Sequence, residues 1–283
     1  MKKKEIIPIA VRLLKNELKT DLNSTSLKKD KTSTYIINEK SKIKINIVAR
    51  SDLILCGIPF IKSFIKEALK DLVFKSKFND GDKVQNNRII ATIFGSSRKI
   101  LAAERTILNF LQNLCSISTT TNKLVSILKK NNTKLLDTRK TVTGLRMVQK
   151  YATHIGGAKN HRFGLYDDIL IKDNHIRISG GINKIYKIIR AQKIKNYKIE
   201  CDNIYQVKEC INQGAKYILL DNMKPNKILD SIQLGKNKKI IFEISGGVNL
   251  KNIHKYTRLN ANYISSGFIT QSPEPVDIGM DII

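Results

Sequence analysis

Residues 197–222 read YKIECDNIYQVKECINQGAKYILLDN, and this stretch decides the fold of the second half of the chain. Apolar and charged residues alternate at 197–200, apolar residues follow at helical spacing over 203–213, and an apolar run stands at 217–220. A strand, a helix and a strand in this order predict one β/α unit of a parallel sheet.

The same unit recurs throughout the second half. Further strands are predicted at 134–136, 169–171, 240–244 and 263–265. Further helices are predicted at 143–155, 181–192, 224–232 and 249–257. Six strands are fewer than the eight of a closed barrel, so the pattern predicts an open, incomplete (β/α) barrel over residues 116–269.

The first half has a different rhythm, typical of an α+β domain. A helix is predicted over 8–20, strands within 34–55, a helix over 61–69 and two helices within 98–130. Alternation in Ile43-Lys-Ile-Asn-Ile-Val carries the strand prediction. We place the domain boundary near residue 115.

Length and composition limit the class of protein. The 283 residues with 41% hydrophobic content suffice for a barrel-sized domain and a smaller one. No apolar run reaches the roughly 18 residues of a membrane span, and the start MKKKE does not resemble a signal peptide. The four cysteines form no metal-site or C-x-x-C spacing, which predicts reduced, buried thiols. We therefore expect a cytoplasmic protein without membrane contact.

The net charge of +27 raises the alternative of a nucleic-acid-binding protein. Only 11 of the 51 basic residues are arginines, and the lysines are scattered among many Asn and Ile residues, all served by A/T-rich codons. Aromatic residues make up 6% and tryptophan is absent, so a stacking platform for bases is missing. The charge indicates base-composition drift or attraction of anionic substrates, and we expect no nucleic-acid partner.

Polar residues follow each predicted barrel strand. They are Asp137–Thr141, Lys172–His175, Glu200–Asn203, Asp221–Asn222, Ser245–Gly247 and Ser266–Gly267. Because the carboxyl ends of barrel strands form one rim, these groups are expected to meet at a single mouth.

The rim combines two kinds of charge. Its cations are Arg139, Lys140, His161, Arg162 and Lys172, with Lys159 close by. So many positive charges in one mouth predict a polyanionic ligand, and arginine suits carboxylate or phosphate. Its acids are Glu200, Asp202 and Asp221, which could hold ribose hydroxyls or a magnesium ion or stabilise positive charge on a sugar.

The glycine loops after the last two strands have two interpretations. Ser245-Gly246-Gly247 and Ser266-Gly267 are either plain βα turns or a phosphate cradle of main-chain N–H groups, and the basic rim favours the cradle. Elsewhere the plain interpretations lead: His154 and His254 as surface or packing residues, and His175 as a residue that orients a loop. Gly156-Gly157 is interpreted as a helix C-cap, and Arg105 alone as part of a solvated helix face.

Several motifs together resemble the quinolinate phosphoribosyltransferase family. They are Leu136-Asp-Thr-Arg-Lys-Thr, Gly156-Gly-Ala-Lys-Asn-His-Arg-Phe-Gly-Leu, Ile171-Lys-Asp-Asn-His, Glu243-Ile-Ser-Gly-Gly-Val and, in the first half, Cys56-Gly-Ile-Pro, Gly95-Ser-Ser-Arg and Glu104-Arg-Thr-Ile-Leu-Asn-Phe-Leu. They run collinearly through nearly the whole chain.

The resemblance implies an N-terminal α/β sandwich domain over 1–115, with a tail at 270–283 that packs back on it, and the open barrel over 116–269. It implies an enzyme of NAD biosynthesis that joins quinolinate to 5-phosphoribosyl-1-pyrophosphate (PRPP), releasing pyrophosphate and CO2 and leaving nicotinate mononucleotide. It implies Mg2+ carried by PRPP without direct protein ligands, and a homodimer in which the partner's first domain completes each mouth, with a hexamer left open.

The resemblance also assigns roles to rim residues. Quinolinate would contact Arg139, His161, Arg162, Lys172 and, from the partner chain, Arg105. PRPP would contact Lys140, Glu200 and Asp221, which are also the predicted catalytic residues. The 5-phosphate would contact Ser245, Gly246, Gly247 and Gly267.

Three stretches depart from the family pattern. The chain has Thr141-Val-Thr-Gly144 where the family has Thr-Thr-Pro-Gly, and Thr270-Gln271-Ser272 where it has Thr-His-Ser. An early acidic-glycine stretch is eroded at 19–24. Gln271 lies near the predicted phosphate loops, where it could weaken PRPP binding. The alternatives are a phosphoribosyltransferase for another base, such as nicotinate, and a basic nucleic-acid-binding protein.

Overall fold

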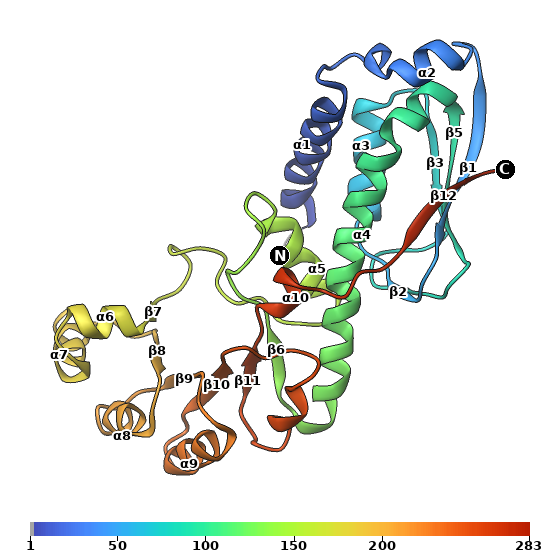
Figure 1. Ribbon diagram of the computed structural model, residues 1–283. Coiled ribbons are helices and arrows are strands. Elements are labelled where there is room, and N and C mark those ends of the chain that lie inside the picture. The colour runs from blue at the N-terminus through green and yellow to red at the C-terminus, as the bar shows by residue number, and fades with distance from the viewer. Residues whose placement is uncertain (1–2) are drawn as a thin grey trace. The chain divides into compact units, whose positions relative to one another are not determined.

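The computed structural model describes residues 3–283, which fall into two units (Figure 1). The first unit contains the described residues up to Asn122 together with Leu145–Gly156 and Pro273–Ile283. The second contains Lys123–Gly144 and Gly157–Ser272. No helix within residues 3–283 has the length and apolar character that crossing a bilayer requires.

The first unit is built on an antiparallel sheet of four strands in the order β12-β1-β5-β3. The strands are β1 (Lys42–Ala49), β3 (Val73–Ser76), β5 (Ile89–Ser96) and β12 (Ile278–Ile282). Alternation predicted β1 correctly: Ile45, Ile47 and Ala49 are buried, whereas Lys42 and Lys44 are exposed. A separate pair joins β2 (Leu53–Ile54) to β4 (Lys83–Val84).

Helices complete the first unit. They are α1 (Lys3–Leu22), α2 (Lys31–Ile36), α3 (Ile58–Ala68), the first part of α4 (Ser97–Leu128) and α5 (Arg146–Ile155), with a 3-10 turn at Leu27–Lys29. Phe60, Phe64 and Ile107 from α3 and α4 pack with Ile47 and Ile93 of the sheet in one apolar core. The unit thus buries one face of its sheet beneath helices.

Two predictions for the first half were wrong in detail. Residues 98–130 form the single helix α4 and a 3-10 turn (Lys129–Asn131), not two helices. Several Ser and Thr residues after Cys115 are buried within this helix, and the Ser118 hydroxyl donates to the carbonyl of Ile54 at 2.6 Å. Residues 34–36 belong to α2 rather than to a strand.

The domain boundaries also differ from the prediction. Helix α4 continues through residue 115, and the two units divide after Asn122. Helix α5, predicted as a barrel helix over 143–155, belongs to the first unit. The reason is packing: Val148 and Tyr151 of α5 join the core of the first unit. The tail at 270–283 was predicted to pack on the first domain, and residues 273–283 do belong to that unit, where β12 pairs with β1.

The second unit is a parallel sheet of six strands in the order β6-β11-β10-β9-β8-β7. The strands are β6 (Lys134–Leu136), β7 (Leu170–Ile171), β8 (Lys198–Cys201), β9 (Tyr217–Asp221), β10 (Ile241–Ser245) and β11 (Tyr263–Ser265). All six predicted strands are confirmed. Strands β6 and β7 end the order without pairing with each other, so the barrel is open as predicted.

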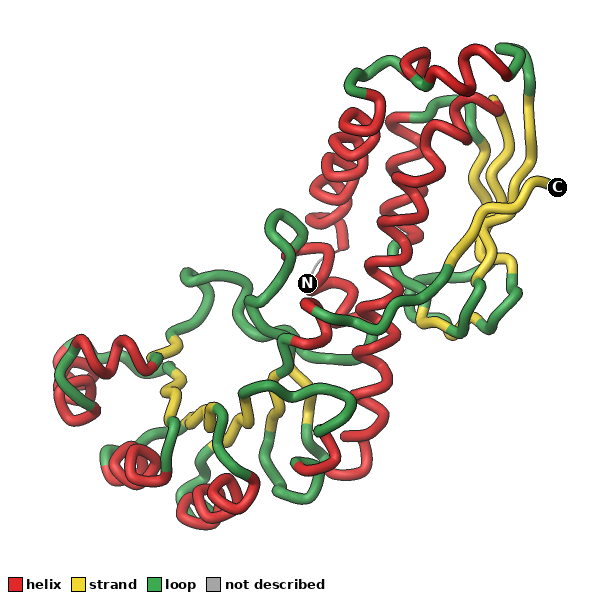
Figure 2. The backbone as a smooth tube through the Cα atoms, in the orientation of Figure 1, coloured by secondary structure: helices red, strands yellow, loops and turns green. Residues whose placement is uncertain are grey.

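Helices cover one face of this curved sheet (Figure 2). They are α7 (Ile182–Ala191), α8 (Ile204–Asn212) and α9 (Pro225–Gly235), while α6 (Asp173–Ile178) and α10 (Phe268–Gln271) are short. Phe242 and Ile244 of β10 belong to the apolar core of the unit, whereas Glu243 and Ser245 line a pocket. The period of two along β10 therefore separates packing from the pocket.

The helix predicted at 249–257 does not form, and a 3-10 turn at Ile253–Lys255 takes its place. The side chains before it bond to the local main chain: Asn252 Oδ1 accepts from the N–H of Asn249 at 2.8 Å, and Asn252 Nδ2 donates to the Gly247 carbonyl at 2.9 Å. Such bonds compete with helix formation. All four cysteines are free and buried, as predicted.

Candidate active site

A pocket opens at the carboxyl ends of the strands of the second unit. It is lined by Thr138, Arg139, Lys140, His161, Arg162, Leu170, Lys172, Glu200, Leu219, Asp221, Asn222, Glu243, Ser245, Gly246, Gly247, Ser265 and Gly267. Eleven of the twelve predicted site residues therefore meet in one place. The twelfth, Arg105, lies exposed on α4 in the first unit and does not line this pocket.

The loop that carries two of the cations is fixed by a buried aspartate. Asp137, which is fully buried, accepts from the His161 N–H at 2.8 Å and from the Asn160 side chain at 2.6 Å. The Lys159 N–H donates to the Leu135 carbonyl at 2.9 Å. These bonds hold residues 159–161 beside β6, which places Arg162 next to the strand end that carries Arg139.

We call Arg139, Arg162 and Lys172 the cationic side of the pocket. The Nε of Arg139 is buried and has no hydrogen-bond partner among the described residues. Arg162 donates through Nη1 to the Asp168 carbonyl at 2.8 Å. Burial, and then the charge of Arg139, lower the pKa of Arg162, against the opposing charges of Asp168 and Asp167. Two neighbouring guanidinium groups, one of which has a buried Nε without a hydrogen bond, indicate an anionic ligand.

The two histidines near the pocket are fixed by the main chain. His175 Nδ1 accepts from the Lys172 N–H at 2.8 Å, so it orients the start of α6, as predicted. His161 Nδ1 accepts from the Arg162 N–H at 2.8 Å. His154 and His254 are exposed, in keeping with their prediction as surface residues, and Gly156 is the C-cap of α5.

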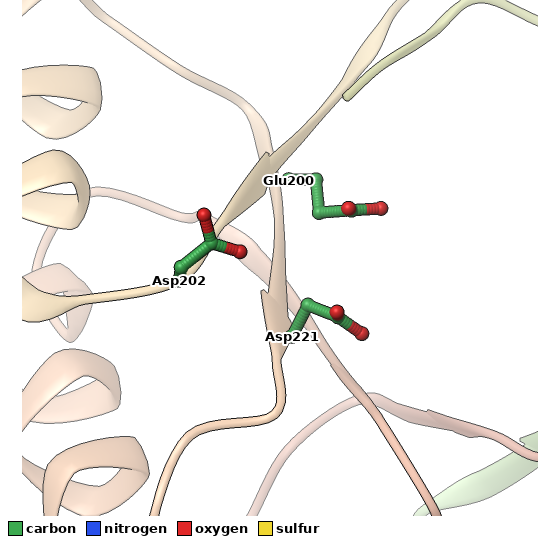
Figure 3. Close-up of side chains that lie close together, drawn as sticks. All are labelled: Glu200, Asp202 and Asp221. Carbon is green, nitrogen blue, oxygen red and sulfur yellow. The ribbon is translucent and has the colours of Figure 1, made fainter. Parts of the chain in front are cut away.

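Three carboxylates approach one another at the ends of β8 and β9 (Figure 3). One oxygen from each of Glu200, Asp202 and Asp221 lies within 4.8 Å of the others. Burial raises the pKa of Glu200, and Lys172, whose Nζ lies 3.1 Å from Glu200 Oε2, lowers it. Burial and then the charges of Asp173 and Asp221 raise the pKa of Asp202.

This donor set fits a magnesium ion. Mg2+ prefers hard carboxylate oxygens and retains waters or phosphate oxygens as further ligands. Besides burial, repulsion from Asp173 and Asp221 raises the pKa of Asp202, and a bound cation would relieve that repulsion. The bond from Lys172 Nζ to Glu200 Oε2 also joins the cationic side to the acids.

We call Ser245, Gly246, Gly247 and Gly267 the glycine side of the pocket. Gly246 has φ +104°, and a Cβ there would overlap Asn222, whose N atom would lie only 2.6 Å away. At Gly267 a Cβ would meet Lys140 Cδ at 3.1 Å and Gln271 Oε1 at 3.2 Å. The two loops therefore present bare main chain to the pocket, and Gln271 lies beside it as predicted.

Sequence reasoning placed Asn222 at the rim without giving it a role, and it did not identify Glu243 or Ser265 as pocket residues. Asn222 adopts φ +53° and its N–H donates to the Ser245 carbonyl at 3.0 Å, so it shapes the turn beneath Gly246. A signal for Glu243 was present, because a charged residue at an inward position of the buried run Ile241–Ser245 has to face a polar interior.

Comparison with known proteins gives one consistent family. "Quinolinate phosphoribosyl transferase, N-terminal domain" matches residues 30–115, and "Quinolinate phosphoribosyl transferase, C-terminal domain" matches residues 117–281. A probable nicotinate-nucleotide pyrophosphorylase [carboxylating] of Bacillus subtilis is 39% identical over 258 residues, 89% of this chain and 88% of that protein. One of Methanocaldococcus jannaschii is 38% identical over 287 residues, 97% of each chain.

Solved structures agree. The crystal structure of nicotinate-nucleotide pyrophosphorylase from Ehrlichia chaffeensis matches with a TM-score of 0.89 and 35% identity, over 100% of this chain and 99% of that one. The similarity therefore covers both units and the pocket rather than the barrel alone.

Proposed function

The chain belongs to the quinolinate phosphoribosyltransferase family, and we propose that its pocket joins quinolinate to PRPP to form nicotinate mononucleotide, pyrophosphate and CO2. This is a pentosyl transfer that supplies NAD biosynthesis. The proposal requires the pocket to accept a small dianion and a sugar polyphosphate side by side.

The observation that carries the proposal is the unpartnered Arg139 Nε beside Arg162. A planar guanidinium binds both oxygens of a carboxylate, and two such groups match a dicarboxylate. A monocarboxylate such as nicotinate would leave one of the cations without a counter-charge. This favours quinolinate over nicotinate as the base.

We assign the cationic side to quinolinate. Arg139, Arg162 and Lys172 would bind its carboxylates, with His161 beside them and Arg105 of the partner subunit closing the mouth. The glycine side would bind the 5-phosphate of PRPP through main-chain N–H groups. Lys140, Glu200 and Asp221 also line the pocket and would contact the ribose and pyrophosphate.

The reaction follows from these charges. When the bond between ribose C1 and the pyrophosphate oxygen breaks, C1 becomes positive, and Glu200 and Asp221 stabilise that charge while Lys140 binds the leaving group. The pyridine nitrogen forms the new bond to C1. Its ring then takes up the electron pair of the C2–carboxylate bond as CO2 leaves, and C2 gains a proton. Arg139 and Arg162 orient the ring for both steps.

Magnesium would be held by PRPP and by the carboxylates of Glu200, Asp202 and Asp221, and when bound it supplies positive charge that offsets the pyrophosphate. The sequence-based expectation was that PRPP alone carries the ion. The convergence of the three acids supports a contribution from the protein.

We propose a homodimer in which Arg105 of the partner subunit reaches the pocket, as the family resemblance implies. Three further expectations stay predictions: assembly into hexamers, a cytoplasmic location and the absence of a nucleic-acid partner. The dimer is checked by mixing an Arg105→Ala variant with an Arg139→Ala variant. Shared sites predict that a mixed dimer regains about one functional site, whereas unshared sites predict no recovery.

The activity is tested by incubating the purified protein with quinolinate, PRPP and Mg2+ and measuring nicotinate mononucleotide and CO2. Nicotinate replaces quinolinate in a parallel reaction, and EDTA replaces Mg2+ in a third. Product from quinolinate alone is expected. Product from nicotinate without CO2 would favour the alternative base, and no product from either in a folded protein would refute the proposal.

A further inference from the structure

Glu243 is a charged residue buried in the floor of the pocket, and the roles assigned above do not use it. It lies on β10 with no exposed surface, and burial raises the pKa of its carboxyl group. Its Oε1 has no hydrogen-bond partner among the described residues. A buried carboxylate oxygen without a partner is costly, so its surroundings indicate what it does.

The other carboxylate oxygen of Glu243, Oε2, is bonded to a tyrosine. The Tyr217 hydroxyl donates to Glu243 Oε2 at 2.6 Å. The Tyr217 ring stacks on Tyr263 with 6.2 Å between centroids and 10° between planes, and Lys198 Nζ lies 4.8 Å from its centre. The ring therefore has little freedom, and it fixes the direction in which Glu243 points.

Glu243 Oε1 faces His161. The distance from His161 Nε2 to Oε1 is 3.7 Å, and both side chains are buried. His161 Nδ1 accepts from the Arg162 N–H at 2.8 Å, so in the neutral ring Nδ1 carries no proton and Nε2 carries it. The proton on Nε2 therefore points toward the acceptor that lacks a donor.

The negative charge of an ionised Glu243 gives a reason for the position of the His161 ring. A bare carboxylate beneath the cationic side would repel a dicarboxylate substrate. Burial raises the pKa of Glu243 most and Asp168 adds to this, whereas hydrogen bonds from Tyr217 and Ser265 and the charge of Lys198 lower it in part. An imidazole N–H placed over Oε1 shields the substrate from that negative charge.

We propose that Glu243 is a positioning residue that holds His161, and that His161 acts on quinolinate through Arg162 rather than by direct contact. This inference rests on the proposed function. In this arrangement Tyr217, Glu243 and His161 form a buried chain of polar contacts, two hydrogen bonds joined by the 3.7 Å contact between Glu243 Oε1 and His161 Nε2, that ends at the main chain of Arg162. Both ring nitrogens of His161 face the protein, which leaves the guanidinium groups to bind the substrate.

The first test compares steady-state kinetics of four variants. Glu243→Leu removes the acceptor for His161, and the KM for quinolinate is expected to rise about 10- to 100-fold with the KM for PRPP changed less than about 3-fold. Glu243→Gln keeps an acceptor oxygen and is expected to stay within about 5-fold of the wild type. Tyr263→Phe removes a neighbouring hydroxyl that is not bonded to Glu243 and serves as the matched control.

The fourth variant separates positioning from folding. In Glu243→Leu the Tyr217 hydroxyl loses its acceptor and stability falls, but Tyr217→Phe/Glu243→Leu removes both partners and restores apolar packing. We expect the double variant to recover its Tm and to keep the high KM for quinolinate. Recovery of both would show that Glu243 only supports folding, and a KM below that of the wild type in Glu243→Gln would show a charge effect instead.

The second test needs no catalysis. In protein labelled with 15N-histidine, the His161 signals, assigned with His161→Gln, are expected to show a protonated Nε2 and an unprotonated Nδ1 between pH 7 and 8. In Glu243→Leu the Nε2 proton is expected to exchange with water at least about 10-fold faster. A proton on Nδ1, or unchanged exchange, would overturn the proposal. If the wild type lacks activity, this test still decides the role of Glu243.

Discussion

The two sides of the pocket bind anions by different means. The glycine side offers main-chain N–H groups, and its residues are fixed by shape, because Gly246 has both a positive φ and Asn222 against it. The cationic side offers Arg139 and Arg162, and its residues are fixed by charge and by the planar form of the guanidinium. A change of shape should therefore abolish function abruptly, whereas a change of charge should weaken one substrate selectively.

The largest effect is expected from Gly246→Ala. The new Cβ would overlap Asn222 and force φ away from +104°, so kcat/KM should fall at least about 100-fold and the Tm should drop. Gly247→Ala is the matched control, because Gly247 has φ +61° and open space where the Cβ would lie. Equal losses in the two variants would mean that packing against Asn222 is not what requires a glycine at residue 246. Kinetics and thermal unfolding decide.

Arg139→Met should impair the cationic side of the pocket selectively. The KM for quinolinate is expected to rise about 100-fold because a charge-assisted bidentate bond is lost, with the KM for PRPP nearly constant. The ligand-free protein should unfold at a higher temperature, because the buried, unpartnered Nε is removed. A lower Tm together with a uniform loss of activity would show that Arg139 supports the fold instead. Arg139→Lys tests whether charge alone suffices.

Gln271→His should sharpen the comparison, because it adds a side chain to the glycine side. Gln271 Oε1 lies 3.2 Å from where a Cβ of Gly267 would be, and the family pattern has histidine at this position. An imidazole donor near the 5-phosphate is expected to lower the KM for PRPP about 3-fold and to leave that for quinolinate unchanged. A higher KM for PRPP would indicate that the loop has adapted to the amide.

The smallest effect is expected from Asp202→Asn, between the two sides. Burial and the charges of Asp173 and Asp221 raise the pKa of Asp202, so its ionised form costs stability in the folded state. In EDTA the variant should therefore have a slightly higher Tm at pH 7, and the difference should vanish as the pH falls through the raised pKa. Added Mg2+ should stabilise the wild type more than the variant. A pH-independent difference would contradict this.

Much of the second unit was predictable because each strand is a short apolar run with a polar end. The runs at 217–220 and 263–265 coincide with β9 and β11 almost residue for residue. Periodicity of α5 predicted a helix, but an amphipathic helix does not specify the surface it covers, and α5 packs in the first unit. The polar run after Cys115 hid the continuity of α4, because its hydroxyls bond to main-chain carbonyls inside the protein.

The candidate site was predictable to the extent that its chemistry lies in residue types at strand ends. Arg139 and Gly246 follow the carboxyl ends of β6 and β10. Because the carboxyl ends of barrel strands form one rim, their position in the sequence predicts that they line the pocket. Asp137 and Glu243 both contact His161, which lies 24 and 82 positions away from them in the sequence. No local sequence pattern predicts contacts over such separations. The proton location on His161 likewise follows only from the bond to its own neighbour.

The unsatisfied Nε of Arg139 has a practical consequence at the bench. A buried guanidinium nitrogen that has no hydrogen-bond partner among the described residues favours the binding of small oxyanions, so phosphate, sulfate or citrate should occupy the pocket and compete with both substrates. By mass action the same ions should raise the melting temperature in proportion to the logarithm of their concentration. Assays in an amine buffer with chloride would therefore avoid competition with the substrates, and storage in sulfate would stabilise the protein.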